Sequence, residues 1–171
     1  MDPLEAHFEK AERLAEITQR VGFTLWQLQE LEGVTATYFV LLAEAKRGMG
    51  ADVGEILVTK AQGKTLGVTI RQLQAGGLLS GELEQRFRNL LTARNWLVHS
   101  SRTDSRAAVH SDSEFGALLL RLDRIAEETR ALLREIGARA EKHVVAHGVS
   151  RQQIDAGAAK LLNKWREADS I

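Results

Sequence analysis

The amino-acid sequence predicts an all-α protein, an antiparallel bundle of five to six helices. Apolar residues recur at spacings of three and four along nearly the whole chain, and capping residues stand where these stretches begin. There is one proline in 171 residues, and the chain is rich in Leu, Ala, Glu, Arg and Gln. These three observations favour helices over strands throughout.

The N-terminal segment predicts two consecutive helices. Asp2 stands before a proline, and Glu5 is placed to complete a capping box, so a helix should begin here. We expect this helix to end near Arg20, because Gly22 interrupts the apolar pattern. Thr24 then predicts the start of a second helix.

Three shorter helices are expected in the middle of the chain. The first spans about 52–63, the second about 65–76, and the third begins after Ser80 and continues to about 98. A Ser-, Asp- and Arg-rich loop should follow over about 100–111.

The last part of the chain predicts one long helix and one short helix. The longest periodic stretch begins at Ser111 and continues toward His147, where Gly148 is a suitable stop. Ser150 then caps a final helix.

Charge and composition exclude several classes of protein. Lys and Arg number 23, as do Asp and Glu, so the net charge is zero and the chain as a whole is not a polybasic nucleic-acid binder. The chain has no cysteine, which excludes disulfides, thiolate nucleophiles and cysteine-ligated metals. No leader-like start and no apolar run of about 20 residues is present, so we expect a cytoplasmic protein that does not interact with membranes.

One charged residue occupies a position that the helical period reserves for the core. The apolar stripe steps through Leu83, Phe87 and Leu90, then Arg94, then Leu97. A guanidinium is costly there unless it is paired, reaches solvent along its own stem, or lies at a protein–protein interface.

Two polar residues follow on the same helix. Asn95 and His99 are four residues apart and share a face, whereas Arg94 and His99 differ by about 140° around the helix. They converge only if the Arg94 side chain folds over, if the helix unwinds near His99, or if two copies of the helix face each other. The structural alternative is a histidine that interacts with the last helical carbonyls.

Arg94-Asn95 followed by His99 resembles the signature of the HEPN superfamily, which has an arginine, a polar residue, and a histidine after a short spacer. The flanks are also similar: Thr65-Leu66-Gly67 opens a helix, and Gly76-Gly77-Leu78 precedes a Leu-rich helix that leads into the motif. The resemblance covers about 52–140. It implies one domain over 1–171, with helices 3–47 and a C-terminal helix 151–168 packed on the HEPN-like core.

The resemblance also implies an activity. HEPN domains commonly dimerise with their motifs at the interface, and active members are metal-independent endoribonucleases that leave a 2′,3′-cyclic phosphate. By resemblance, His99 would act as general base or acid, Arg94 would stabilise the pentacoordinate phosphate, and Asn95 would orient the phosphate or His99. We therefore expect a homodimer through this helix, RNA as substrate, and a toxin or phage-defence role, with no metal or cofactor.

The chemistry of these residue types agrees with that expectation. An imidazole exchanges protons near neutral pH, and a guanidinium donates two hydrogen bonds to phosphate oxygens. Arg88, Arg102 and Arg106 lie close to the motif in sequence and would guide RNA phosphates, although solvated arginines fit the pattern as well. His110 is also close, but a surface histidine is the simpler interpretation.

Two other functions stay open. One is a non-catalytic HEPN-like module that partners an antitoxin, a nucleotidyltransferase or a defence complex; the other is a plain helical adaptor. His143 and His147 have a spacing that zinc can use, but no third ligand is evident, so we expect no metal. Trp26, Trp96 and Trp165 are expected to be core or interface anchors.

Overall fold

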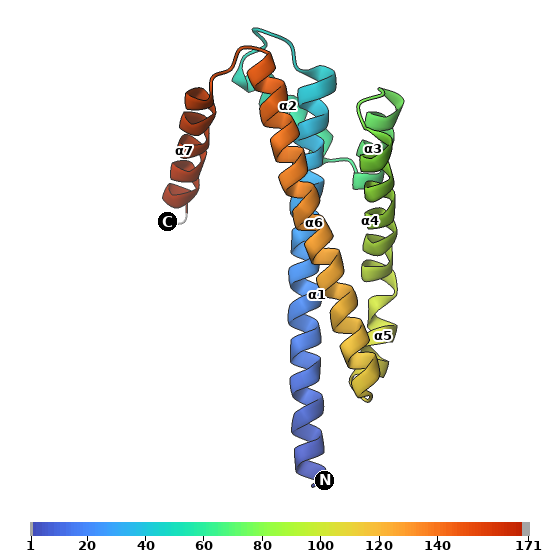
Figure 1. The fold of residues 1–171 in the computed structure, drawn as a ribbon. Coiled ribbons are helices and arrows are strands. Elements are labelled where there is room, and N and C mark those ends of the chain that lie inside the picture. Colours follow the sequence, from blue (N-terminus) through green and yellow to red (C-terminus); the bar gives the residue numbers. More distant parts are fainter. Residues whose placement is uncertain (1, 169–171) are drawn as a thin grey trace. The chain divides into compact units, whose positions relative to one another are not determined.

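The protein is all-helical in the computed structural model, which describes residues 2–168 (Figure 1). No strand occurs among these residues, and they form seven α-helices rather than five to six. Residues 1 and 169–171, the ends of the expected domain, lie outside the described part. No helix in that part combines the length and apolar character that a membrane span needs.

The elements follow one another in a simple order. They are α1 (Pro3–Phe39), the π-helical turn η1 (Val40–Glu44), α2 (Ala51–Gln62), α3 (Leu66–Ala75), α4 (Gly81–His99), α5 (Ser101–Ala108), α6 (Asp112–Ala146) and α7 (Arg151–Ala168). The chain divides into two compact units, Met1–Ile136 and Gly137–Ile171.

The N-terminal segment is one helix, so the two helices expected there and the break at Gly22 are wrong. Ile17, Thr24, Leu28 and Leu31 are all buried, and their spacing keeps one helical phase across Gly22. A glycine inside a helix costs about 1 kcal/mol relative to alanine. Continuous burial on one face outweighs that local cost.

The start of α1 is the capping box that the sequence predicts. The backbone N–H of Leu4 donates to Asp2 Oδ1 at 3.1 Å, and the N–H of Asp2 donates to Glu5 Oε2 at 3.3 Å. This reciprocal pairing satisfies two backbone donors that the first turn would otherwise leave free.

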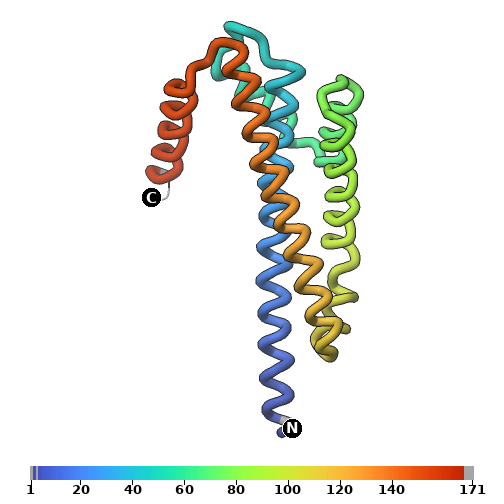
Figure 2. Tube along the Cα trace, viewed as in Figure 1, coloured from blue at the N-terminus to red at the C-terminus, as the bar shows by residue number. Residues whose placement is uncertain are grey.

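The first unit is built mainly from three long helical segments, α1, α4 and the first part of α6. Figure 2 shows α1 and the first part of α6 running in the same direction, with α4 running opposite to both. The ion pairs between α1 and α6 confirm that these two helices are parallel. Arg13 bonds Asp112 and Arg20 bonds Asp123, so residue numbers increase together along both helices. The expected antiparallel arrangement therefore applies to α4 but not to the pair α1–α6. With 12 and 10 residues, α2 and α3 are short, and α4, with 19 residues, runs back beside part of the 37-residue α1.

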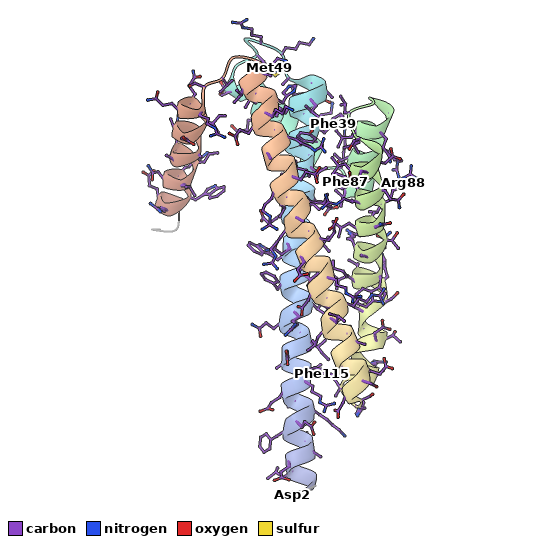
Figure 3. The ribbon with its side chains drawn as sticks, viewed as in Figure 1. Asp2, Phe39, Met49, Phe87, Arg88 and Phe115 are labelled. Atoms are coloured by element: carbon purple, nitrogen blue, oxygen red, sulfur yellow. The ribbon has the colours of Figure 1, made fainter. Side chains whose placement is uncertain are left out.

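The core of this unit lies between α1, α3, α4 and α6. Phe87 is fully buried on α4 and points toward α1, whereas its neighbour Arg88 points away into solvent (Figure 3). The other large, fully buried side chains are Ile17, Leu28, Leu31, Leu66, Leu73, Leu83, Leu122, Leu132 and Ile136.

The start of α3 depends on a residue of α1. Thr65 precedes this helix, as expected, but its side chain makes no capping bond. Instead, Glu32 Oε1 accepts a hydrogen bond from the backbone N–H of Leu66 at 2.8 Å. A carboxylate at a helix N-terminus also interacts favourably with the helix dipole.

The segment after α4 is the helix α5 and not the expected loop. Ser101 and Ala108 are buried on one face of it, seven residues apart, and the Ser101 hydroxyl donates to the carbonyl of Leu97. Both buried residues are small, so the segment has almost none of the large apolar residues by which an amphipathic helix is recognised.

The second unit holds the end of α6 and α7. Gly148 has φ +90°, and the N–H of Val149 bonds the Val144 carbonyl at 3.1 Å, so the glycine ends α6 as expected. Arg151 Nε donates to Glu141 Oε1 at 2.8 Å across the turn. The bounds of α7 match the expected helix 151–168, and its packing on the core stays a prediction.

Arg86 connects α4 to α6 through two carboxylates. Its Nε donates to Glu128 Oε1 at 2.7 Å, and its Nη1 bonds Glu135. The bond to Glu128 raises the pKa of Arg86 above its ordinary value. This double link holds the upper half of α4 in register with α6.

Removing this link should destabilise the protein measurably. Arg86→Ala leaves two carboxylates without their cation, and we expect the free energy of unfolding to fall by about 1–3 kcal/mol. Arg88→Ala is the matched control on the same helix, since Arg88 bonds only Glu84 on the exposed surface, and it should cost less than about 0.5 kcal/mol. Urea denaturation measures both; equal midpoints would contradict the structural role of Arg86.

Candidate functional site

Arg94, Asn95 and His99 all lie in the last turns of α4. The helix is regular up to His99, its final residue, so it does not unwind between Arg94 and His99. Asn95 and His99 are both exposed and, being four residues apart, share one face. Within one chain, the Arg94 and His99 backbone positions therefore stay about 140° apart around the helix.

Arg94 is half-buried on the stripe whose other members are core residues. Among the described residues it makes no hydrogen bond and no ion pair. The other half-buried arginines in that part of the chain, Arg13, Arg20 and Arg86, each bond two carboxylates. Arg94 is thus a half-buried arginine without a protein partner in the described part of the chain.

Trp96, between the motif residues, is held by two side chains from other helices. Its Nε1 donates to Asp104 Oδ2 on α5 at 2.9 Å. The guanidinium carbon of Arg121 on α6 lies 3.4 Å from the centroid of the indole ring, and its Nη1 is 3.5 Å from the same Asp104 oxygen. This Trp96–Asp104–Arg121 cluster fixes the end of α4 against α5 and α6.

Neither Asp104 nor Arg121 is predicted from the sequence as a site residue. Asp104 falls in the expected loop over about 100–111, and Arg121 is one of several arginines on the long helix α6. No spacing along the chain connects them, because their contact exists only once three helices have packed. Asp104 follows Trp96 by eight positions. This spacing indicates a contact between them only when the segment 101–108 is known to be helical.

The arginines expected to guide RNA differ in their surroundings. Arg88 is exposed and bonded to Glu84, one turn earlier on α4. Arg102 and Arg106 lie on α5 and not in a loop; both are exposed and, four residues apart, they share one face. Since α5 begins two residues after His99, these two cations follow the motif directly.

The three tryptophans have different environments. Trp96 is half-buried, whereas Trp26 on α1 and Trp165 on α7 are mostly exposed. Trp26 and Trp165 are therefore not core residues, and an interface role for either stays a prediction.

His143 and His147 stack on each other in the second unit. Their ring centroids are 4.3 Å apart, and His147 Nδ1 lies 2.8 Å from the carbonyl oxygen of His143. Partial burial lowers the pKa of His143 below its ordinary 6.5, and His147 lowers it further. No group of three potential metal ligands occurs in the described part of the chain, so this pair has no third ligand there.

Comparisons of the chain with protein-family models, with curated proteins and with solved structures gave no match. A function for the chain must therefore be inferred from its own residues.

Asp104 should stabilise the corner between α4 and α5. Asp104→Ala removes the acceptor of the Trp96 indole N–H, and we expect a loss of about 1 kcal/mol in the free energy of unfolding. Asp104→Asn keeps a carbonyl acceptor and should lose less. Urea denaturation and the Trp96 indole N–H resonance in an NMR spectrum measure both; an unshifted resonance in Asp104→Ala would contradict the cluster.

The lowered pKa of His143 predicts how the stability of the protein depends on pH. Because protonation of His143 is less favourable in the folded chain, the unfolded chain binds more protons just below pH 6.5, and stability should decrease as the pH falls through this range. In an NMR titration, His147→Gln should raise the pKa of His143 but leave it below 6.5, since burial is the larger cause. A His143 pKa at or above 6.5 in the wild type would refute this account.

Proposed function

We propose that this protein is a metal-independent endoribonuclease of HEPN type, with Arg94, Asn95 and His99 as its site. The observation that carries the proposal is the half-buried Arg94, which has no partner among the described residues while comparable arginines are each bonded twice. A phosphate would satisfy such a guanidinium with two parallel, charge-assisted hydrogen bonds.

The proposed reaction uses the ribose of the substrate as its own nucleophile. The 2′-oxygen attacks the adjacent phosphorus, the bond to the 5′-oxygen breaks, and the products are a 2′,3′-cyclic phosphate and a free 5′-hydroxyl. One imidazole removes the proton of the 2′-hydroxyl, and one donates a proton to the departing 5′-oxygen. Arg94 stabilises the additional negative charge on the phosphorane, and Asn95 orients the phosphate or His99.

A second copy of the chain would complete this arrangement. In one chain, α4 is regular through His99, so the Arg94 and His99 backbones point about 140° apart. Two α4 helices facing each other would bring the arginine of one copy to the histidine of the other and supply both the acid and the base. We therefore propose a homodimer through the helix that carries Arg94–His99, with Arg102 and Arg106 contacting RNA phosphates beside it.

A toxin or phage-defence effector, restrained by an antitoxin or a nucleotidyltransferase partner, is the cellular role that we propose for such an enzyme. The alternative is a non-catalytic HEPN-like module within a similar complex. Two observations favour the alternative: the net charge is zero, and Arg88 is already bonded to Glu84.

RNA cleavage in the presence of EDTA tests the activity. The wild-type protein should cut single-stranded or structured RNA and leave a 2′,3′-cyclic phosphate, and it should not cut an oligonucleotide with 2′-deoxyribose at the scissile position. His99→Ala should lower the rate by about 10²- to 10⁴-fold, the usual contribution of general acid–base catalysis. Arg94→Ala should lower it comparably.

The matched controls are His110→Ala and Arg71→Ala, which remove an exposed histidine and an exposed arginine outside the proposed site. Both should cut at nearly the wild-type rate. Cleavage that His99→Ala leaves intact would refute the assignment. A folded wild-type protein without any cutting that co-purifies with a stoichiometric partner would support the non-catalytic module instead.

A further inference from the structure

The N-terminal half of α1 carries a second apolar face, opposite the buried one. At about 100° per residue, six residues lie within about 40° of a common direction, roughly 180° from the buried stripe of Ile17, Thr24 and Leu28. All six are exposed: they are Leu4, Phe8, Ala11, Ala15, Gly22 and Trp26. We call this set the outer strip of α1.

The spacing and composition of the outer strip are those of a helix–helix seam. Its steps of four and three from Leu4 to Ala15 follow a heptad period, which keeps one seam facing a partner helix. The strip contains no charged residue. Phe23 lies at its edge, with its ring centroid 6.4 Å from that of Trp26, and a shallow hollow beside it is lined in part by Ala15, Gln19 and Phe23.

No contact within the described chain explains the glycine in this strip. Gly22 is helical, not at positive φ, and a Cβ added there would meet no atom within 4 Å. The residue lowers the stability of the helix by about 1 kcal/mol relative to alanine. A small residue at an exposed helical position is useful where another backbone or a bulky side chain approaches closely.

The exposed apolar area of the outer strip is a substantial part of what a protein–protein interface needs. Phe8, Phe23 and Trp26 are 60%, 46% and 54% exposed. An aromatic side chain presents about 150–250 Å², so these three alone leave on the order of 300 Å² of apolar surface open. Leu4 and the alanines of the strip extend this surface along a helix segment about 33 Å long, and a stable interface buries roughly 800 Å² per partner.

We propose that the outer strip pairs with the outer strip of a second copy of this chain, with the two α1 helices antiparallel and Ala15 on the two-fold axis. In this register, position numbers that face each other sum to about 30. Phe8 then lies over Gly22 of the second copy, and Leu4 meets Trp26. The Phe8 ring therefore fits over a residue without a side chain, and Leu4 packs against the Trp26 indole.

Charge also favours this register over a parallel one. Glu12, at the edge of the strip, faces Gln19 of the second copy and not another carboxylate. A parallel pair in register would place Phe8 against Phe8 and Trp26 against Trp26, holding the helices apart and leaving Ala11, Ala15 and Gly22 without contact.

This surface differs from the α4 surface proposed to carry the RNA site. Because α4 packs against the buried side of α1, the outer strip faces away from it. Pairing through α1 is therefore independent of the proposed nuclease activity, and either proposal can fail alone.

The absence of cysteine makes site-specific cross-linking a direct test. Disulfides form only where Cα atoms approach to about 7 Å, so they report position. Ala15→Cys should form a disulfide-linked dimer at least about tenfold faster than Lys10→Cys, since pairing raises the effective thiol concentration into the millimolar range. Lys10 is exposed on the same helix but outside the strip.

A mixture of two further variants determines the direction of the helices. When Ala11→Cys and Gln19→Cys are combined, with one carrying a tag, the mixed disulfide should exceed both self-linked species. Self-linked Ala11→Cys as the main product would overturn the antiparallel register. Cross-linking of Ala15→Cys no faster than that of Lys10→Cys would overturn the pairing itself; the near-native circular dichroism expected of these exposed substitutions confirms that each variant is folded.

Discussion

The uninterrupted buried stripe on α1 is the constraint on which the first unit depends. From Ile17 to Thr35 its residues keep one phase, and α3, α4 and α6 all contribute to the core that this stripe faces. Because the helix cannot rotate without exposing Leu28 and Leu31, the residues on its opposite side are committed to solvent. The same constraint therefore explains both the core and the exposed apolar strip between Leu4 and Trp26.

Arg94 shows the opposite situation on α4. The stripe that buries Phe87 and Leu90 continues through Arg94, so the packing that stabilises the helix leaves this arginine half-buried. In Arg86, two turns earlier, the fold solves the same problem with two glutamates from α6. At Arg94, no carboxylate in the described part of the chain takes this role. A guanidinium without a protein counter-charge can bind phosphate through charge-assisted hydrogen bonds, and this is the physical basis of the proposed phosphate site.

Features determined by neighbours in sequence could be predicted, and features determined by packing could not. The capping box at Asp2, the stop at Gly148 and the misplaced charge of Arg94 depend on local chemistry and helical period, and all three were predicted from the sequence. The unbroken α1 and the helix α5 were not, because burial from other helices overrides the local signals of Gly22 and of a Ser-rich segment. The Trp96–Asp104–Arg121 cluster and the cap that Glu32 gives α3 join residues from different helices, so no pattern along one segment reveals them.

The joint between α4 and α5 has a consequence for His99. Ser100 alone separates the two helices and serves as the C-cap of one and the N-cap of the other, while the bonds from Ser101 to Leu97 and from Trp96 to Asp104 cross this joint. The backbone that carries the imidazole is therefore braced on both sides and is not part of a flexible connection. A group on such a rigid corner loses little conformational entropy when it engages a ligand, so more of its interaction energy is retained as affinity.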